Sequence, residues 1–190
     1  MLRDIFLQRK KDVLSRKDKS SIGKWDEKIV KLCNKRNKLD NYYTTSSCSG
    51  RIIIIPDKDK KARNLFLKRY HNLISFKQLK EDLQEIAEKT KQLIKFKLDP
   101  CALHVASREL ESANKLYFKA KLAGWKKSGI IAVNTKYVLE LNSTERLEFP
   151  IINNGKILVN DNFLKILVKR ANIKLKNTWK KIENLEKSLK

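Results

Sequence analysis

The apolar residues of this chain recur over most of its length with a period of three to four, the spacing typical of amphipathic helices. This spacing predicts helices over 24–39, 75–90 and 109–123, a basic helical segment within 1–20, and a long final helix over 161–190. In the final helix an apolar stripe steps by three or four residues from Leu164 to Leu189, and Asp161 is placed to cap it. A stripe of this length needs a surface to pack against, so we expect the final helix to contribute to the core.

Segments rich in β-branched residues lie between these helices and are bounded by turn residues, a pattern that favours strands. The predicted strands cover 42–55, 64–70, 94–98, 102–106, 126–133, 137–142, 146–150 and 157–159. The first of these segments is interpreted as two strands around a turn, because hydroxyl residues up to Ser49-Gly50 give way to the aliphatic run Arg51–Ile55. Asp99-Pro100 likewise separates two neighbouring strands.

This order of elements predicts an α+β fold with helices packed on a mixed, largely antiparallel sheet, and not a Rossmann arrangement. The chain has only five Gly and three Pro and no linker-like stretch, so we expect residues 1–190 to form a single domain. Ser49-Gly50 and Ser128-Gly129 stand in similar surroundings in the two halves, which an internal duplication would explain. The alternative is that two unrelated α+β segments look alike.

Positive charge is in large excess, because 44 Lys and Arg against 21 Asp and Glu give a formal net charge of +23. Residues 1–40 contain 13 basic and six acidic side chains, and residues 165–190 contain nine and two. A polyanion would supply the opposite charge, so nucleic acid is the leading partner. Arg supplies only ten of the 44 positive charges, which favours attraction to phosphate over reading of bases. The alternative is that the lysines only keep the protein soluble.

Several classes of protein are excluded by the composition. The longest aliphatic run, Ile52–Ile55, is far shorter than the roughly 20 residues of a membrane span, and residues 1–19 are too charged for a signal peptide. The spacing of Cys33, Cys48 and Cys101 fits neither a disulfide framework nor a CxxC zinc site. We therefore predict no metal site and a reduced, cytoplasmic location.

The densest polar cluster is Thr44–Arg51, which combines hydroxyl side chains, a turn and one guanidinium. Such a group can bind an anion or a carboxylate, whereas no Walker loop and no GxGxxG motif is present. A polar strand followed by a glycine turn is the structural alternative.

His104 lies in the predicted strand between Leu103 and Val105, so alternation turns it away from both of them. It could face a polar cleft or have a structural place in the core. Cys48 could act as a nucleophile, but no general base can be paired with it from the sequence, and a small side chain at a turn is the other interpretation.

The order of several blocks along the chain makes a family recognisable. The blocks are 43–52, 96–105, 128–130, 143–150 and 171–177. From about Ser20 to Leu185 the sequence closely resembles the tRNA wybutosine-synthesising protein 3 family, whose members are S-adenosylmethionine-dependent methyltransferases. The resemblance implies methylation of N4 of a wyosine-type base at position 37 of phenylalanine tRNA, beside the anticodon. The family lacks the Gly-rich Rossmann signature, in agreement with its absence here.

The resemblance also implies roles for individual residues. Those implied to bind S-adenosylmethionine are Ser46, Ser47, Ser49, Gly50, Arg51, Ser128 and Gly129. Arg51 suits the methionine carboxylate, and His104 is the candidate catalytic residue, because the ordinary pKa of an imidazole, about 6.5, suits it to orient the base or relay its proton. Arg108 and His71 are expected to bind substrate, and Trp125 or Tyr43 to stack on the base.

Phosphates of the anticodon stem are expected to meet outward lysines of the final helix, namely Lys169, Lys176 and Lys180. In one respect the chain departs from the family, since Asn142 stands where an Arg is usual and the charge must come from elsewhere. Two rival functions remain: a non-catalytic module that grips the anticodon stem-loop, and a basic DNA-coating protein. Binding of a methyl donor separates the enzyme from both.

Overall fold

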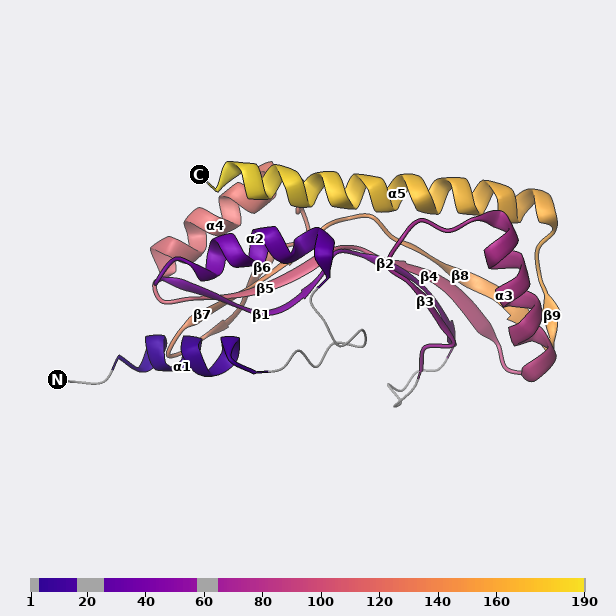
Figure 1. Ribbon diagram of the computed structural model, residues 1–190, viewed down its shortest axis with the longest axis horizontal. Helices are drawn as coiled ribbons and strands as arrows, with labels where there is room; N and C mark the ends of the chain where they lie inside the picture. The colour runs from indigo at the N-terminus through magenta and orange to yellow at the C-terminus, as the bar shows by residue number, and fades with distance from the viewer. Residues whose placement is uncertain (1–3, 17–25, 58–64, 190) are drawn as a thin grey trace. The chain divides into compact units, whose positions relative to one another are not determined.

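The computed structural model describes residues 4–16, 26–57 and 65–189 (Figure 1). Contacts between Cα atoms divide the chain into two compact units, each built from segments that are separate in the sequence. The first unit comprises Met1–Ser49, Cys101–Thr144 and Thr178–Lys190, and the second comprises Gly50–Pro100 and Glu145–Asn177. The prediction of a single domain for residues 1–190 stays a prediction, and each unit is described by itself.

The sheet of the first unit has four antiparallel strands. In spatial order these are β1 (Tyr42–Cys48), β5 (Ala102–Ser107), β7 (Tyr137–Asn142) and β6 (Gly129–Val133). A bulge near Thr45 shifts the register of β1 against β5. The central strands β5 and β7 contribute fully buried apolar side chains to one face of the sheet.

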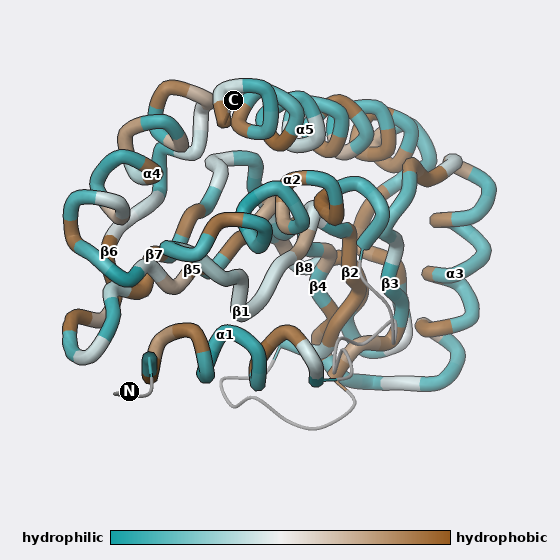
Figure 2. Tube along the Cα trace, turned by 60° about the vertical axis from the view of Figure 1, so that its left-hand side comes forward, coloured by the Kyte–Doolittle hydropathy of each residue, from teal (hydrophilic) through white to brown (hydrophobic). Residues whose placement is uncertain are grey.

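Helices cover both faces of this sheet (Figures 1 and 2). They are α1 (Ile5–Leu14), α2 (Glu27–Asn37), α4 (Leu110–Leu122) and the last part of α5 (Asp161–Ser188). The main core lies between the sheet and α2, α4 and α5, and Ile29, Leu116 and Leu185 belong to the same buried cluster as Leu103. On the other face Phe6 of α1 makes a smaller cluster with Tyr43 and Ala106.

The second unit contains a five-stranded antiparallel sheet, α3 (Phe76–Lys89) and the first part of α5. Its strands, in spatial order, are β3 (Lys68–Tyr70), β2 (Arg51–Pro56), β4 (Ile94–Asp99), β8 (Leu147–Asn153) and β9 (Lys156–Ile157). Ser75 caps α3 by accepting a hydrogen bond from the Gln78 amide, as the capping box predicts. Asn172 of α5 binds the backbone of Ile74 through both its amide oxygen and nitrogen, at 3.0 and 2.8 Å.

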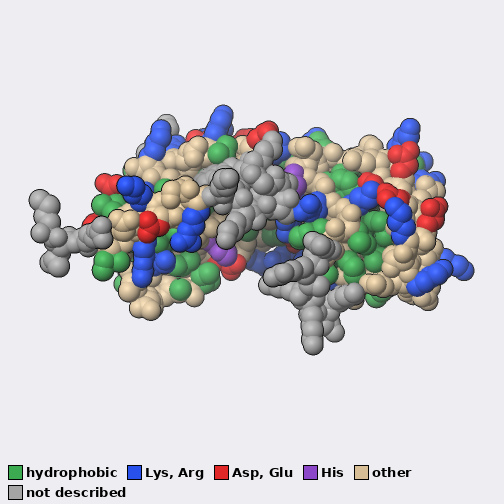
Figure 3. All heavy atoms as spheres, turned by 60° about the horizontal axis from the view of Figure 1, so that its bottom comes forward, with side chains coloured by type: hydrophobic (Ala, Val, Ile, Leu, Met, Phe, Trp, Pro, Cys, Tyr) green, Lys and Arg blue, Asp and Glu red, His purple; other side chains and the backbone are tan. Residues whose placement is uncertain are grey.

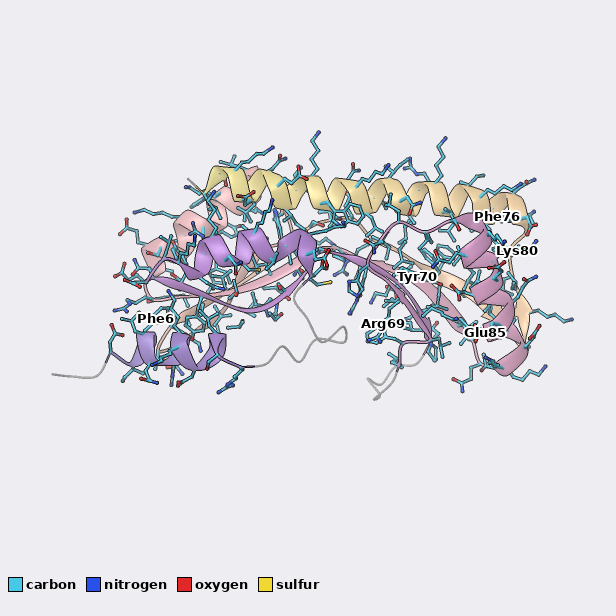
Figure 4. All side chains as sticks on the ribbon, viewed as in Figure 1. Phe6, Arg69, Tyr70, Phe76, Lys80 and Glu85 are labelled. Carbon is cyan, nitrogen blue, oxygen red and sulfur yellow. The ribbon has the colours of Figure 1, made fainter. Side chains whose placement is uncertain are left out.

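Polar contacts fasten the short edge strand β3 to α3 (Figure 4). The Tyr70 hydroxyl donates to Asp82 at 2.5 Å, and the Lys68 ammonium lies 2.6 Å from carboxylate oxygens of both Asp82 and Glu85. Hydrogen bonds from Lys68 and then Lys89 lower the pKa of Glu85 to about 2. This network holds an edge strand of only three residues in place.

The predicted α+β class is confirmed, and every described strand pair is antiparallel, so the sheets are not mixed. The strands on either side of Ser49-Gly50 do not pair with each other, and neither do those on either side of Pro100. β1 pairs with β5 and β2 pairs with β4, because the chain passes from one unit to the other at Ser49-Gly50 and again after Pro100. The duplication also gains no support, since Ser128-Gly129 opens β6 inside the first unit and is not equivalent to Ser49-Gly50.

Element boundaries differ from prediction in a few places. The helix predicted over 24–39 is described from Glu27, with residues 24 and 25 outside the described residues, as is residue 64 of the predicted strand 64–70. The cap of α5 is Asn160, whose side chain accepts from the Phe163 amide at 2.9 Å, and not Asp161. The stripe from Leu164 to Leu189 is buried as predicted, apart from partly exposed Trp179.

Candidate active site

A row of four residues, one from each strand, crosses the sheet of the first unit. His104 on β5 pairs with Ser46 on β1 and with Glu140 on β7, and Glu140 pairs with Gly129 on β6. Ser46, His104 and Gly129 come from three separate blocks of the sequence and were each predicted to belong to the site. The strand register brings these three together in what we call the cross-strand row.

The side chains of the cross-strand row point away from the main core. Leu103 precedes His104 and Leu141 follows Glu140, and both leucines are fully buried in that core. Because successive side chains of a strand alternate between faces, His104 and Glu140 lie on the opposite face. Their side chains are 31% and 42% exposed, so a ligand can reach this face.

Helix α1 covers the end of the same face that lies near Ala106. Phe6 points from α1 toward the sheet (Figure 4) and its ring lies 5.1 Å from that of Tyr43. Arg108 fastens this helix, since its guanidinium lies 2.8 Å from the Asp4 carboxylate and over the Phe6 ring. The structure therefore gives Arg108 a structural function, and a contact with substrate stays a prediction.

His104 and Glu140 form a hydrogen-bonded pair, with 3.1 Å between the imidazole Nε2 and the carboxylate Oε1. A carboxylate accepts hydrogen bonds and has none to donate, so Nε2 carries the proton in this contact. The lone pair of the neutral ring is then on Nδ1. The pair can accept a proton at Nδ1 and stabilise the resulting imidazolium.

Gly129 gives the row an open end at β6. A Cβ atom built on Gly129 would meet no atom of the described residues within 4 Å, apart from its two chain neighbours. Its neighbour Ser128 is used differently, because its hydroxyl donates to the Trp125 carbonyl at 2.6 Å and accepts from the Asn142 amide at 3.1 Å. Ser128 thus fixes the chain where β6 begins, and Gly129 leaves space above the sheet.

The predicted serines of the first block have different surroundings. Ser46 is exposed at the end of the row, whereas Ser47 is hydrogen-bonded to Cys33 of α2. Ser49 is fully buried, and both its amide and its hydroxyl donate to Asp26, at 3.1 and 2.5 Å. Of these hydroxyls, that of Ser46 is the one placed on the accessible face.

The remaining residues of that block begin the second unit. Gly50 has φ +93°, a conformation that favours glycine, and lies where the chain leaves the first unit. The Arg51 Nε lies 3.4 Å from the Asp99 carboxylate, and the guanidinium is 4.8 Å from the centre of the Phe66 ring. Arg51 is thus held by an ion pair and an aromatic contact within the second unit, and its role toward a donor stays a prediction.

Comparison with known proteins identifies the family. The family described as Methyltransferase TYW3 matches residues 8–190. The chain belongs to this family.

Relatives of this TYW3-family chain are named for one and the same enzyme activity. A protein of Thermococcus sibiricus is 37% identical over 183 residues, which is 95% of this chain and 91% of the relative. A protein of Methanocaldococcus jannaschii is 38% identical over 81% of this chain and 80% of its own. Both are named tRNA(Phe) 7-((3-amino-3-carboxypropyl)-4-demethylwyosine(37)-N(4))-methyltransferase.

Solved structures share the fold of this chain. The PH1069 protein from Pyrococcus horikoshii matches with a TM-score of 0.83 and 32% identity, covering 96% of this chain and 92% of that one. A hypothetical protein from Aeropyrum pernix has the same fold, with a TM-score of 0.72 at 23% identity over 84% and 94% of the two chains.

Both aromatic residues predicted to stack on the base were wrong choices for this TYW3-family fold. Trp125 is fully buried, with its Nε1 donating to the Lys181 carbonyl at 3.0 Å. Tyr43 is fully buried against Phe6. Large aromatic residues next to polar motifs are as useful for packing a small unit as for binding a base, and the sequence does not separate the two uses.

The predicted phosphate-binding lysines are exposed, as expected from the helical stripe. Lys169, Lys176 and Lys180 lie on the outward side of α5, the first two in the second unit and the third in the first. His71 directly follows β3 in the second unit and is partly buried. Binding of tRNA by these four residues stays a prediction.

Glu140 is the member of the row that sequence reasoning missed. The predicted strand over 137–142 contained the necessary signal, because alternation around the apolar Leu139 and Leu141 places Glu140 on the polar face. What the sequence could not supply is the register that sets Glu140 beside His104.

Reactive cysteines, metal-binding groups or membrane-spanning helices in the described part of the chain would indicate other functions. Burial raises the pKa of the Cys33 and Cys101 thiols to about 12, which makes both poor nucleophiles at neutral pH. Among residues 4–16, 26–57 and 65–189 no group of three or more metal-binding side chains occurs, and none of the described helices is long and apolar enough to cross a membrane.

Proposed function

We propose that this TYW3-family protein methylates N4 of the wyosine-precursor base at position 37 of phenylalanine tRNA, using S-adenosylmethionine, and that the cross-strand row is its reaction site. One observation supports this site above others. Residues from three blocks, Ser46, His104 and Gly129, lie in register on one accessible face of a single sheet.

S-adenosylmethionine, when bound, supplies a methyl group carried on a sulfonium. A ring nitrogen attacks the methyl carbon in line with the C–S bond, so that this bond breaks as the N–C bond forms. His104 accepts the proton that N4 loses, at Nδ1, because Nε2 is engaged with Glu140. The sheet holds the imidazole on a central strand, which limits its motion.

The row also has features that suit the donor. Above Gly129 there is room for a ligand to approach the backbone closely, since in the described part of the chain only its two neighbours come within 4 Å of a Cβ built there. The exposed Ser46 hydroxyl can donate a hydrogen bond to a ligand at the other end of the row.

The tRNA would be held mainly through its phosphates. The chain carries a formal charge of +23, and Lys and Arg side chains spread over the face drawn in Figure 3. Position 37 lies in the anticodon loop, where a base can leave its stack and reach a site on the protein surface. We propose that the reaction takes place in the cytoplasm.

The proposal is tested by incubating the protein with methyl-labelled S-adenosylmethionine and tRNA from a strain that lacks this gene. We expect label in phenylalanine tRNA, on N4 of base 37, and none in tRNA that has an unmodified guanosine there. Calorimetry on the protein alone should detect binding of the donor. Binding of tRNA without any binding of donor would contradict the enzyme and favour a module that only grips the anticodon stem-loop.

A further inference from the structure

We propose that Glu140 is a positioning residue that fixes the orientation and proton placement of His104 for methyl transfer. The inference rests on the proposed function, because it assigns Glu140 a role through His104. It starts from the 3.1 Å contact between Nε2 and Oε1 and from the direct pairing of the two residues across β5 and β7.

The contact is built into the most constrained part of the sheet. β5 and β7 are its two central strands, and residues directly opposite each other on one face have Cβ atoms only about 5 Å apart. No loop has to order for His104 and Glu140 to meet. The orientation of the imidazole is therefore set by the sheet and by the carboxylate together.

Glu140 contacts a histidine although the chain has 44 Lys and Arg. Other carboxylates described above, such as those of Asp4 and Glu85, pair with Arg or Lys. A carboxylate kept beside an imidazole in so basic a protein has a specific effect on that ring: it accepts the Nε2 proton and leaves Nδ1 as the acceptor.

The charge of the pair matches the reaction. When N4 gives its proton to Nδ1, the imidazole becomes a cation, and the Glu140 carboxylate next to Nε2 stabilises it. The other members of the row, Ser46 and Gly129, carry no charge. Charged groups described at the α1-covered end of this face include Arg108, paired with Asp4, Lys10, paired with Asp40, and Lys136, bonded to the Tyr43 hydroxyl.

The test is a double-mutant cycle with Glu140→Gln, His104→Ala and the two combined, measured as single-turnover methylation of the precursor tRNA. We expect Glu140→Gln to slow wild-type methylation at least about tenfold, less than the about 100-fold loss expected without the imidazole. Donor and tRNA affinities should stay within about twofold. In the His104→Ala background, Glu140→Gln should have no further effect.

The matched control is Glu111→Gln, which removes an exposed carboxylate that pairs with Lys115 on α4 and should leave the rate unchanged. A normal rate for Glu140→Gln, or an equal loss in both backgrounds, would overturn the role of Glu140 while the proposed function stands. A normal rate for His104→Ala would overturn the proposed roles of both His104 and Glu140, but not the proposal that the protein transfers a methyl group.

A second readout does not depend on activity. Glu140→Gln should change the ring-nitrogen NMR signals of His104, because the ring loses the carboxylate that contacts Nε2, while the signals of His71 stay unchanged. The chain has only these two histidines, so nitrogen NMR of the rings resolves both. Identical ring-nitrogen signals of His104 in the two proteins would refute the proposal.

Discussion

Replacing Gly129 by alanine separates ligand binding from folding at the cross-strand row. Gly129 opens β6, and a Cβ there would meet no described atom within 4 Å beyond its two chain neighbours. Its backbone is not among those of positive φ, so alanine can adopt it without strain. The added methyl group projects into the space that the proposal assigns to the donor.

The Gly129→Ala substitution is expected to change folding stability and donor binding in opposite directions. Gly→Ala at a compatible position stabilises by about 0.4–1 kcal/mol, mainly by restricting the unfolded chain, which raises Tm by roughly 1–4 °C for a chain of this size. If the donor approaches this backbone closely, the added methyl group weakens the binding free energy by about 1–3 kcal/mol, which raises the Kd of the donor about 5- to 150-fold.

The assay combines thermal unfolding of the free protein with calorimetric titration of S-adenosylmethionine. The control is Gly124→Ala, where φ is +94° and the new Cβ would lie 3.2 Å from Lys181 Cγ. That variant should lose about 1–2 kcal/mol of stability and keep its donor affinity. If Gly129→Ala binds donor as tightly as wild type, the space above Gly129 is not the donor site.

Three further predictions concern the remaining predicted residues and the electrostatics of the second unit. Arg51→Ala should weaken the binding free energy of the donor by about 1.5–3 kcal/mol in calorimetry if the guanidinium holds the methionine carboxylate. A loss of protein stability alone would make Arg51 a structural residue. Replacing Lys169, Lys176 and Lys180 together by Gln should flatten the salt dependence of tRNA binding without changing discrimination at base 37, and an unchanged slope would make them solvated surface. The pKa of Glu85 is lowered from 4.5 to about 2, so the contribution of its carboxylate to stability is complete above about pH 4.5 and disappears as the pH falls toward 2. Glu85→Gln should therefore lose less stability than wild type between pH 4.5 and pH 2.

Local patterns predicted most elements of this fold, but not which strands pair. The aliphatic run of β2 and the capping box of α3 depend on neighbouring residues alone, and both were predicted. The pairing of β1 with β5 is a contact between residues about 60 positions apart, as between Ser46 and His104. Gly50 and Pro100 signal a turn, but nothing in a turn residue says that the next strand joins another sheet.

The candidate site was predictable to the extent that it rests on side-chain chemistry. Ser46, His104 and Gly129 were predicted from the residues and from the family resemblance, and register then placed them together. Trp125 was misjudged because burial depends on the packing of α4 and α5, which no local motif encodes. Glu140 was missed because its partner lies 36 residues away in the sequence.

The central claim, that methyl transfer takes place on the open face of the first unit's sheet, is tested most directly by His104→Ala. Single-turnover methylation of precursor phenylalanine tRNA should be slower by about 100-fold or more, with the Kd for S-adenosylmethionine nearly unchanged, because the variant loses proton acceptance and keeps the donor contacts. A His104→Ala protein that methylates N4 of base 37 at the wild-type rate would contradict the account.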